Sequence, residues 1–429
     1  MIVRRSALTI YATLSISFPI SAADAAAPTP APALKTLYYF EPASGPGPNG
    51  LALGSGGALY GTTTDVAGGA GTVYSLKPPA PPGGSWTETV LYSFTGGGDG
   101  GAPYAGVVIG KKGALYGTTR YGGAFNPNCP QGCGTVFSLA PPTSPGGPWV
   151  ERVLYAFTGG NDGAYPFAAV VIGSGGGLFG TTQAGGPSNV GTVFRLIPPS
   201  AQGGVWTETV LHSFAGSDGS APQASVVIGK GGVLYGTTAY GGNFSVNCSL
   251  GCGTVFSLAP PASPEGSWTE AILHEFTYGE DGLLPGGVVI GGGGVLYGTT
   301  ESGGISAFAG TVFSLTPPTS TGGAWTEDVL YSLKGFPGDG GSPFAGVVIG
   351  SGGVLYGTTD FGGLSTDWGT VFSLAPPASP GGAWTETVLY SFTGGSDGGF
   401  PLTGLVIGAR GVLYGTTNSA YGTVFALKL

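Results

Sequence analysis

The five residues Leu115-Tyr116-Gly117-Thr118-Thr119 decide the fold, because the same string, with one Tyr-to-Phe change, recurs seven times along the 429-residue chain. Successive copies lie 56 to 63 residues apart, and their aromatic position is occupied in turn by Tyr60, Tyr116, Phe179, Tyr235, Tyr297, Tyr356 and Tyr414. Regular spacing of this length is typical of architectures in which one structural unit is repeated and each unit packs on its neighbours.

Each unit contains four short apolar runs separated by glycine or proline. In the second unit these runs are residues 107–110, 115–119, 135–139 and 152–157. They are rich in β-branched and aromatic residues, which favours strands, and nothing in the repeat has the 3.6-residue period of a helix. Seven such units predict an all-β fold, a seven-bladed β-propeller with four-stranded antiparallel blades.

The two ends of the chain predict how the ring closes. The last unit supplies apolar runs at 405–408, 413–417 and 423–429, and then the chain ends without a fourth run. Residues 34–40 near the N-terminus resemble the fourth run of the other units, since Leu37-Tyr38-Tyr39-Phe40 matches Leu91-Tyr92-Ser93-Phe94. We therefore expect the N-terminal strand to pair with the C-terminal blade, where it covers an otherwise open edge.

The combination of Leu-Tyr-Gly-Thr-Thr, a Gly-Gly pair and Gly-Thr-Val-Phe-Ser-Leu resembles the GloVer tandem repeat of exported bacterial proteins, also called choice-of-anchor GloVer-repeat proteins. The resemblance covers about residues 34–429, in all seven copies. It implies export, but it implies no reaction and no catalytic residues. Members of that family typically carry a C-terminal surface anchor, and we expect none in this chain.

The N-terminus predicts export independently. Arg4 and Arg5 precede an apolar stretch at 7–20, and Ser21-Ala22-Ala23 offers the small residues of a cleavage site. We predict a signal peptide at 1–23, a Pro/Ala spacer at 24–33 and a single propeller domain at 34–429, located in the periplasm or outside the cell. We expect no membrane anchor.

Composition limits the classes of partner. Charged residues make up only 8% of the chain, the net charge is −9, and basic residues form no cluster. This balance argues against nucleic acid as a partner, because binding to phosphate backbones depends on grouped lysine and arginine. The expected partner is a glycan or an extracellular protein, and no cofactor is expected.

The four cysteines form two local pairs, Cys129 with Cys133 and Cys248 with Cys252. Paired cysteines in an exported chain predict disulfides. Free thiols and a shared zinc site are the alternatives, and zinc is disfavoured because the two pairs belong to different blades. We predict no metal site.

Three repeated polar features are interpreted as structural. An Asp-Gly pair recurs where the chain passes from one blade to the next, as a turn residue or, alternatively, a calcium ligand. A glutamate follows Trp-Thr, or a close variant, at the start of each outermost strand, where a charge would discourage edge-to-edge association. His212 and His274 each replace a tyrosine, so neither a Ser-His-Asp triad nor a histidine metal centre is expected.

The loops that join the second and third strands vary in length and content, whereas the turns at the opposite face repeat nearly unchanged. Variable loops on a rigid scaffold are where binding usually resides. The variable loops also hold Gln183, Glu301 and several further aromatic residues, while packing of the loops on one another is the alternative interpretation. The candidate ligand-binding residues are Arg120, Tyr121, Tyr240, Asp360, Phe361 and Trp368.

Two classes of function follow. The first is a binding or interaction module that uses the face formed by the B–C loops, between second and third strands, and the D–A loops, between blades. The second is a propeller-type carbohydrate-active enzyme, a glycosidase or polysaccharide lyase. A glycosidase needs two carboxylates about 5 to 10 Å apart, and Glu301, Asp360 and Asp367 are the residues that could supply them. No catalytic residue is assigned, and whether two of these carboxylates share one concave pocket distinguishes the two classes.

Overall fold

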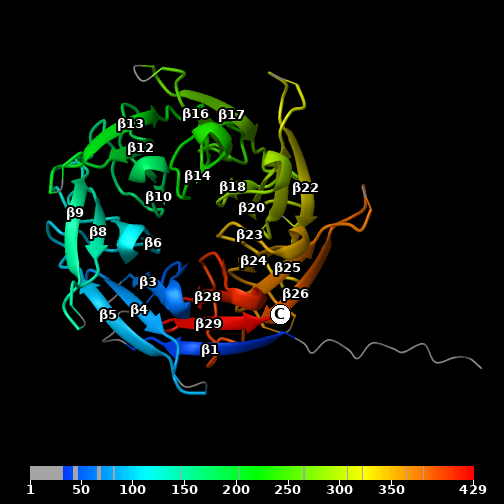
Figure 1. Ribbon diagram of the computed structural model, residues 1–429. Helices are drawn as coiled ribbons and strands as arrows, with labels where there is room; N and C mark the ends of the chain where they lie inside the picture. Colours follow the sequence, from blue (N-terminus) through cyan, green and yellow to red (C-terminus); the bar gives the residue numbers. More distant parts are fainter. Residues whose placement is uncertain are drawn as a thin grey trace, which may run out of the picture. The chain divides into compact units, whose positions relative to one another are not determined.

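The computed structural model describes residues 32–41, 47–64, 69–80, 83–144, 146–201, 203–263, 266–306, 308–320, 322–364, 366–379 and 381–429. The predicted signal peptide and nearly all of the predicted spacer lie outside the described residues. From Pro32 onward the chain forms seven antiparallel sheets arranged in a ring around a central axis (Figure 1). The prediction of a seven-bladed β-propeller is confirmed.

Strands A and B of each blade lie nearest the axis (Figure 1). Strand A has two residues in every blade: β2 (Ala52–Leu53), β6 (Val108–Ile109), β10 (Val171–Ile172), β14 (Val227–Ile228), β19 (Val289–Ile290), β23 (Val348–Ile349) and β27 (Val406–Ile407). Strand B carries the recurring string: β3 (Leu59–Thr63), β7 (Leu115–Thr119), β11 (Leu178–Thr182), β15 (Leu234–Thr238), β20 (Leu296–Ser302), β24 (Leu355–Thr359) and β28 (Leu413–Thr417). A further short strand, β18 (Leu283–Pro285), also pairs with β20.

Strands C and D complete each blade toward the outside. Strand C is β4 (Thr72–Lys77), β8 (Thr135–Ala140), β12 (Thr192–Ile197), β16 (Thr254–Ala259), β21 (Thr311–Thr316), β25 (Thr370–Ala375) and β29 (Thr423–Lys428). Strand D is β5 (Thr87–Ser93), β9 (Val150–Ala156), β13 (Thr207–Ser213), β17 (Thr269–Glu275), β22 (Thr326–Ser332), β26 (Thr385–Ser391) and β1 (Ala33–Tyr39). Strand D of the second blade begins two residues earlier than predicted, because Val150, directly after Trp149, already pairs with Ala140 of strand C.

Single turns of 3-10 helix join strands A and B in every blade. They are η1 (Ser55–Gly57), η2 (Lys111–Gly113), η3 (Ser174–Gly176), η4 (Lys230–Gly232), η5 (Gly292–Gly294), η6 (Ser351–Gly353) and η7 (Ala409–Gly411). Within the described ranges, no helix has the length and apolar character needed to cross a membrane.

The recurring string has a physical reason at each position. Gly117 lies opposite Phe137 in the sheet, and a Cβ at Gly117 would come within 2.6 Å of that ring, so only glycine lets the ring cross the strand. The second threonine, Thr119, forms a hydrogen bond with Thr135 of strand C at 2.8 Å. The first, Thr118, donates a hydrogen bond to the carbonyl of Ala168 in the next blade at 2.9 Å. The string therefore specifies both the blade and its junction with its neighbour.

A second junction involves the tryptophan that precedes strand D. In six blades this indole packs edge-on against the strand B aromatic of the preceding blade, with ring centroids 5.8 to 6.5 Å apart. The pairs are Trp86–Tyr414, Trp149–Tyr60, Trp206–Tyr116, Trp268–Phe179, Trp325–Tyr235 and Trp384–Tyr297. Such aromatic pairs contribute about 0.5 to 1.5 kcal/mol beyond the area they bury.

The ring closes as predicted. β1 pairs antiparallel with β29, from Ala33 opposite Lys428 to Tyr39 opposite Thr423, and it forms the outer strand of the seventh blade. Phe40 is 1% exposed and packs edge-on against Tyr74 of the first blade at 5.0 Å. Because one strand is bonded to the last blade and the residue after it is buried in the first, the two ends of the chain are held together.

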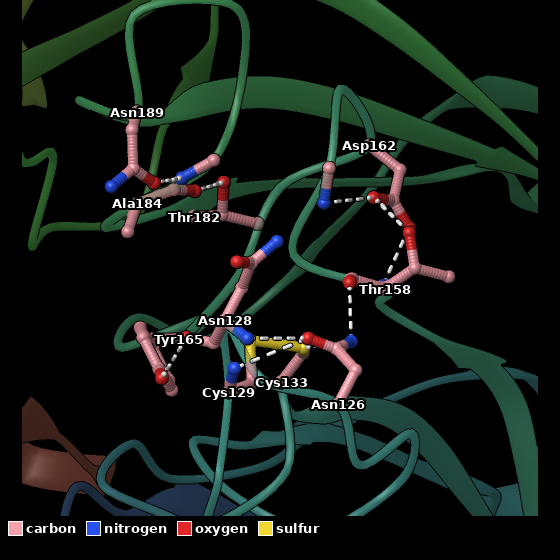
Figure 2. The surroundings of a disulfide bond; sticks show 12 residues. Asn126, Asn128, Cys129, Cys133, Thr158, Asp162, Tyr165, Thr182, Ala184 and Asn189 are labelled. Carbon is pink, nitrogen blue, oxygen red and sulfur yellow. Dashed lines mark hydrogen bonds between the residues drawn. A yellow bond between two sulfur atoms is a disulfide. The ribbon is translucent and has the colours of Figure 1, made fainter.

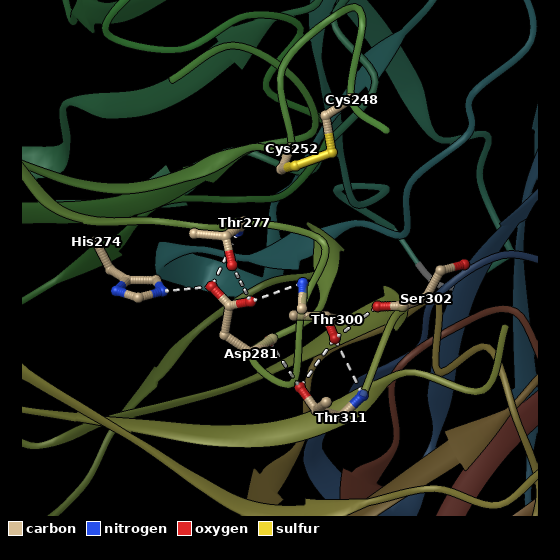
Figure 3. Close-up of polar contacts among 9 residues, drawn as sticks. Cys248, Cys252, His274, Thr277, Asp281, Thr300, Ser302 and Thr311 are labelled. Atoms are coloured by element: carbon tan, nitrogen blue, oxygen red, sulfur yellow. Dashed lines mark hydrogen bonds and ion pairs between the residues drawn. A yellow bond between two sulfur atoms is a disulfide. The ribbon is translucent and has the colours of Figure 1, made fainter. Parts of the chain in front are cut away.

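The Asp-Gly pairs form turns at the start of the D–A loops, which supports the structural interpretation. Asp281 accepts hydrogen bonds from the amide and hydroxyl of Thr277, at 2.9 and 2.7 Å, and lies 3.4 Å from Nε2 of His274 (Figure 3). Burial acts to raise the pKa of Asp281, but these hydrogen bonds outweigh it and the pKa lies below its usual value. In the second blade Tyr155 makes the equivalent bond to Asp162 at 3.1 Å, so His274 takes over the role of a tyrosine.

The strand D glutamates are half-buried, which is less exposed than a charge that protects a sheet edge would be. In all six blades that carry one, a carboxylate oxygen is buried and has no hydrogen-bond partner among the described residues: these glutamates are Glu88, Glu151, Glu208, Glu270, Glu327 and Glu386. Side chains alternate across a strand, and the glutamate position turns toward the preceding blade, near its Asp-Gly turn.

Candidate functional site

Three adjoining cavities form the axial mouth, at the end of the ring where the B–C and D–A loops meet. The largest has a volume of about 560 Å³ and is lined by residues of blades one, two, three, six and seven. A second, of about 230 Å³, lies at blades four to six. The third, of about 340 Å³, is the central channel, which the residues just before and within strand A of all seven blades line. Phe344 lines all three cavities.

The residue directly after the Thr-Thr pair of strand B supplies the polar part of the mouth. Around the ring this position holds Thr64, Arg120, Gln183, Ala239, Glu301, Asp360 and Asn418. Thr64, Asp360 and Asn418 line the large cavity, and Ala239 and Glu301 line the second one. The position is structurally equivalent in every blade, so its variation changes the chemistry of the mouth without changing the scaffold.

The residue after the proline of the D–A loop is apolar or aromatic in four blades and supplies most of the apolar part. It is Tyr104, Phe167, Gln223, Phe344 or Leu402 in blades two, three, four, six and seven. In blades one and five the segment between this proline and strand A is shorter by one residue, since a single residue separates Pro48 from Gly50 and Pro285 from Gly287. The large cavity includes the shorter segment of blade one and the second cavity that of blade five. The cavities therefore lie where the ring lacks a side chain that fills it elsewhere.

Arg120 is held within the aromatic wall. The rings of Tyr104 and Phe167 stack at 5.1 Å, and the guanidinium of Arg120 lies 5.1 and 5.5 Å from their centroids. It also lies 5.3 Å from the ring of Tyr121 and donates a hydrogen bond to Gln183 at 3.1 Å. Arg120 thus stabilises the wall through cation–π contacts, and it is not among the residues that line the cavities.

Two carboxylates face the mouth from adjacent blades. Burial raises the pKa of Asp360, and the nearby Asp367 raises it further. Burial likewise raises the pKa of Glu301, with a further increase from Asp360, while a hydrogen bond with Ser342 lowers it. Asp360 lines the large cavity and Glu301 the second one. Among the described residues, no cavity of the mouth is lined by two carboxylates, which is the arrangement that the glycosidase interpretation requires.

The remaining polar side-chain groups of the large cavity are the amides of Asn49 and Asn418 and the hydroxyls of Thr64, Tyr104 and Thr403. Asn49 is 7% exposed, and its Nδ2 donates hydrogen bonds to Thr64 at 2.6 Å and to the carbonyl of Pro103 at 2.7 Å. The backbone amide of Asn418 donates to the carbonyl of Gly399 at 2.9 Å. The side chain of Asn49 is therefore held in place before any ligand arrives, whereas the buried Oδ1 of Asn418 has no hydrogen-bond partner among the described residues. Over the described parts of the chain, no group of three or more histidine, cysteine, aspartate or glutamate side chains could hold a metal ion.

The structure separates the six predicted binding residues into two groups. Asp360 and Tyr240 line cavities of the mouth, and Arg120 lies in its aromatic wall. Tyr121, Phe361 and Trp368 pack against loops instead. Tyr121 and Phe361 pair through their backbones with Gly101 and Gly341 of the D–A loops. Trp368 covers the glycines at 394 and 399 and packs on Phe400 at 4.8 Å, so it supports a residue that does line the cavity. Ligand binding by any of the six stays a prediction.

Sequence reasoning missed most of the apolar lining. The overlooked residues are Asn49, Tyr104, Phe167, Phe344, Phe400, Leu402 and Asn418. All of these residues except Asn418 belong to the D–A loops, whereas the candidate residues were taken from the B–C loops. Alignment of the seven D–A loops on their shared proline would have revealed both the aromatic position and the two loops that lack it.

The two predicted disulfides are confirmed. Cys129 bonds to Cys133 in the second blade and Cys248 to Cys252 in the fourth. The first bridge is buried against the D–A loop, since a Cβ at Gly159 would lie 2.6 Å from the sulfur of Cys129 (Figure 2). Asn126 extends this contact by donating a hydrogen bond to the carbonyl of Thr158 at 2.7 Å. The first bridge therefore packs its B–C loop against the loop that leads to the next blade.

Replacing Cys129 and Cys133 together by serine is expected to lower the free energy of unfolding by about 2 kcal/mol, the chain-entropy contribution of so short a closed loop. The ring should still assemble, because no blade strand depends on the bridge. Thermal unfolding of the variant and the parent measures the effect, and non-reducing peptide mapping checks the pairing. An unchanged melting temperature, or crossed pairing between the blades, would contradict this expectation.

Comparison with known proteins supports the fold and the family. The extracellular domain of a putative one component system from B. thetaiotaomicron superposes with a TM-score of 0.50 at 11% identity, over 89% of this chain and 39% of that one. PorZ, a surface component of the type-IX secretion system of Porphyromonas gingivalis, gives a TM-score of 0.47 at 14% identity, over 88% of this chain and 46% of that one. This chain spans less than half the length of either, and identities this low concern the fold alone.

An AA12 carbohydrate-active enzyme from Trichoderma reesei gives a TM-score of 0.45 at 12% identity, over 93% of this chain and 98% of that one. No curated protein sequence matches significantly. A family model, described as the Gloeobacter/Verrucomicrobia repeat, matches residues 27–248 and 244–429, which together cover the whole propeller. The seven-fold string, the closed ring and this match agree, and the chain is a member of the Gloeobacter/Verrucomicrobia repeat family.

Proposed function

We propose that the protein is an exported binding module that takes a glycan at the axial mouth. The observation that carries this proposal is the large cavity of about 560 Å³. Its volume lies within the range of about 300 to 1,000 Å³ that small-ligand sites occupy. The two buried disulfides fit an exported protein, because such bonds persist in oxidising compartments.

The lining of the cavity supports a sugar ring as the ligand. Tyr104, Phe167, Phe344 and Phe400 provide aromatic surface, on which the apolar C–H face of a sugar can pack. Phe344 is 37% exposed, so its ring is available at the entrance. Hydroxyl groups of the sugar can bond with the polar groups of Asn49, Asp360 and Asn418, which line the same cavity. A few polar groups among aromatic walls orient a ligand that the walls hold.

The test begins with a glycan array and a peptide array probed with the purified protein. For a glycan that binds, isothermal titration calorimetry then compares the parent with Phe344→Ala and Asp360→Asn. Each variant is expected to weaken binding by at least about tenfold, which corresponds to about 1.4 kcal/mol. Phe125→Ala is the matched control, because Phe125 is an aromatic residue of a B–C loop, 55% exposed, that lines none of the described cavities.

Equal loss of affinity in the Phe125→Ala control would place the site elsewhere on this face. Binding to peptides and to no glycan would show that the ligand class is wrong while leaving a binding module in place. Retention of full affinity by both mouth variants would contradict the proposal itself.

A further inference from the structure

The seam between the sixth and seventh blades differs from every other junction of the ring. In the other six junctions a tryptophan indole covers the strand B aromatic of the preceding blade. At the seam the strand B aromatic is Tyr356, and among the described residues it has no aromatic partner of this kind. The register explains why: Ala33 lies opposite Lys428 as Thr87 lies opposite Lys77, so Pro32 occupies the position that holds Trp86 in the first blade.

A cavity lies at this place. The seam cavity has a volume of about 500 Å³ and is lined by Tyr356, Ile407, Arg410, Leu413 and Leu429, together with glycines of two A–B turns. The equivalent cavity between the second and third blades, where Trp206 covers Tyr116, has about 290 Å³. The additional lining at the seam includes Leu413 and Leu429, and Leu429 is 44% exposed.

We propose that the seam cavity is a binding site for an aromatic side chain, the indole of a tryptophan supplied by a partner protein. Six copies of the same architecture show that an indole fits against the strand B aromatic, a tyrosine in five of them and Phe179 in one, and the seventh copy keeps the tyrosine while lacking the tryptophan. The described part of the chain contains all seven tryptophans: six are those of the junctions, and Trp368 packs on Phe400.

The chemistry of the lining fits this ligand. Tyr356 offers the ring that makes an edge-on contact at the other six junctions, and Ile407, Leu413 and Leu429 offer apolar surface. Arg410 adds a guanidinium, a group that stacks favourably on an indole face. The seam cavity lies at the face that carries the A–B turns, opposite the axial mouth, so this inference is independent of the proposed glycan site.

The probe for the test is 5-fluoroindole, whose binding is followed by 19F NMR line broadening. The parent protein is expected to bind it weakly, with a Kd of about 1 mM or tighter, as suits a ligand of this size. Pro32→Trp supplies the indole from within the chain, so this variant should reduce probe binding at least tenfold and raise the melting temperature. Trp206→Ala opens the equivalent cavity at another junction and should gain a second binding event.

Three outcomes would overturn the proposal. Equal binding by the parent and by Pro32→Trp, without thermal stabilisation of the variant, would place the probe elsewhere. If Trp206→Ala bound the probe and the parent protein did not, the seam would not accept an indole. Absence of binding by both proteins would show that such a cavity does not hold a free indole. Phe125→Ala serves as the unrelated control and should bind as the parent does.

Discussion

Deletion of residues 33–40 is expected to destabilise the protein more than any single loop change. The deletion removes β1, which supplies strand D of the seventh blade, and it exposes the edge of β29. It also removes two hydrogen bonds to the neighbouring D–A loop, from Thr36 to the carbonyl of Ser396 at 3.0 Å and from Tyr39 to that of Gly395 at 2.8 Å. An unpaired edge also promotes association with other chains, so we expect aggregation as well as a lower melting temperature.

A point substitution separates closure from the loss of a whole strand. Phe40 is 1% exposed and packs in the first blade, so Phe40→Ala should cost about 3 to 5 kcal/mol. Deletion of residues 24–31, a segment of equal length that precedes the strand, is the control and should leave the melting temperature unchanged. Differential scanning calorimetry measures the melting temperatures of both deletion variants and of Phe40→Ala. A ring that melts at the parental temperature without residues 33–40 would show that closure does not depend on β1.

The second large effect is a gain of thermal stability on mild acidification. Burial, with a smaller contribution from the acidic turn of the preceding blade, raises the pKa of Glu151, Glu208 and Glu270 to about 7, from an ordinary value of 4.5. Glu327 and Glu386 also reach about 7, mainly through burial. Between pH 4.5 and about 7, the folded protein therefore binds more protons than the unfolded chain. Their contribution to stability is fully present below pH 4.5 and is lost as the pH rises through about 7.

Other carboxylates act in the opposite direction at lower pH. Hydrogen bonds from Thr95 and Tyr92 outweigh the effect of burial and lower the pKa of Asp99 below 3.8, so its contribution is lost only as the pH falls below that value. We therefore expect the melting temperature to be highest near pH 4.5 and several degrees lower at pH 8. One unit of pKa corresponds to about 1.4 kcal/mol, and the half-exposed position of these glutamates reduces that figure through solvent screening.

Glu208→Gln assigns this effect to a residue. The variant removes the charge and keeps the shape, so it should raise the melting temperature at pH 8 and leave it unchanged at pH 4.5. Glu275→Gln, at an exposed position of strand D, is the matched control and should change neither value. A parent protein that is most stable at pH 8, or a Glu208→Gln variant with an undiminished pH dependence, would refute the assignment.

The candidate site could be predicted only in part. Arg120 and Asp360 each directly follow a copy of the recurring string, so both could be identified from their position in the repeat. Trp368 is a large aromatic residue in a variable loop, which suggested a ligand contact, but two glycines of the next loop give its indole a surface to cover. Whether an aromatic side chain faces a ligand or a neighbouring loop depends on packing partners that lie outside its own segment.

The number of blades, the strand order, the closure by residues 34–40 and the two disulfides could all be predicted from the sequence alone. Each of these is encoded locally or by direct comparison of one repeat with the next, so no three-dimensional information was needed. The residues that form the axial mouth, and the cavity left open at the seam, depend on how the seven blades pack in the folded ring. Phe344 and Tyr104 are 240 positions apart in the chain, and they line one cavity because seven blades return to a common axis. The seam exists because the seventh blade takes its outer strand from the other end of the chain, without the tryptophan that precedes strand D in the other blades.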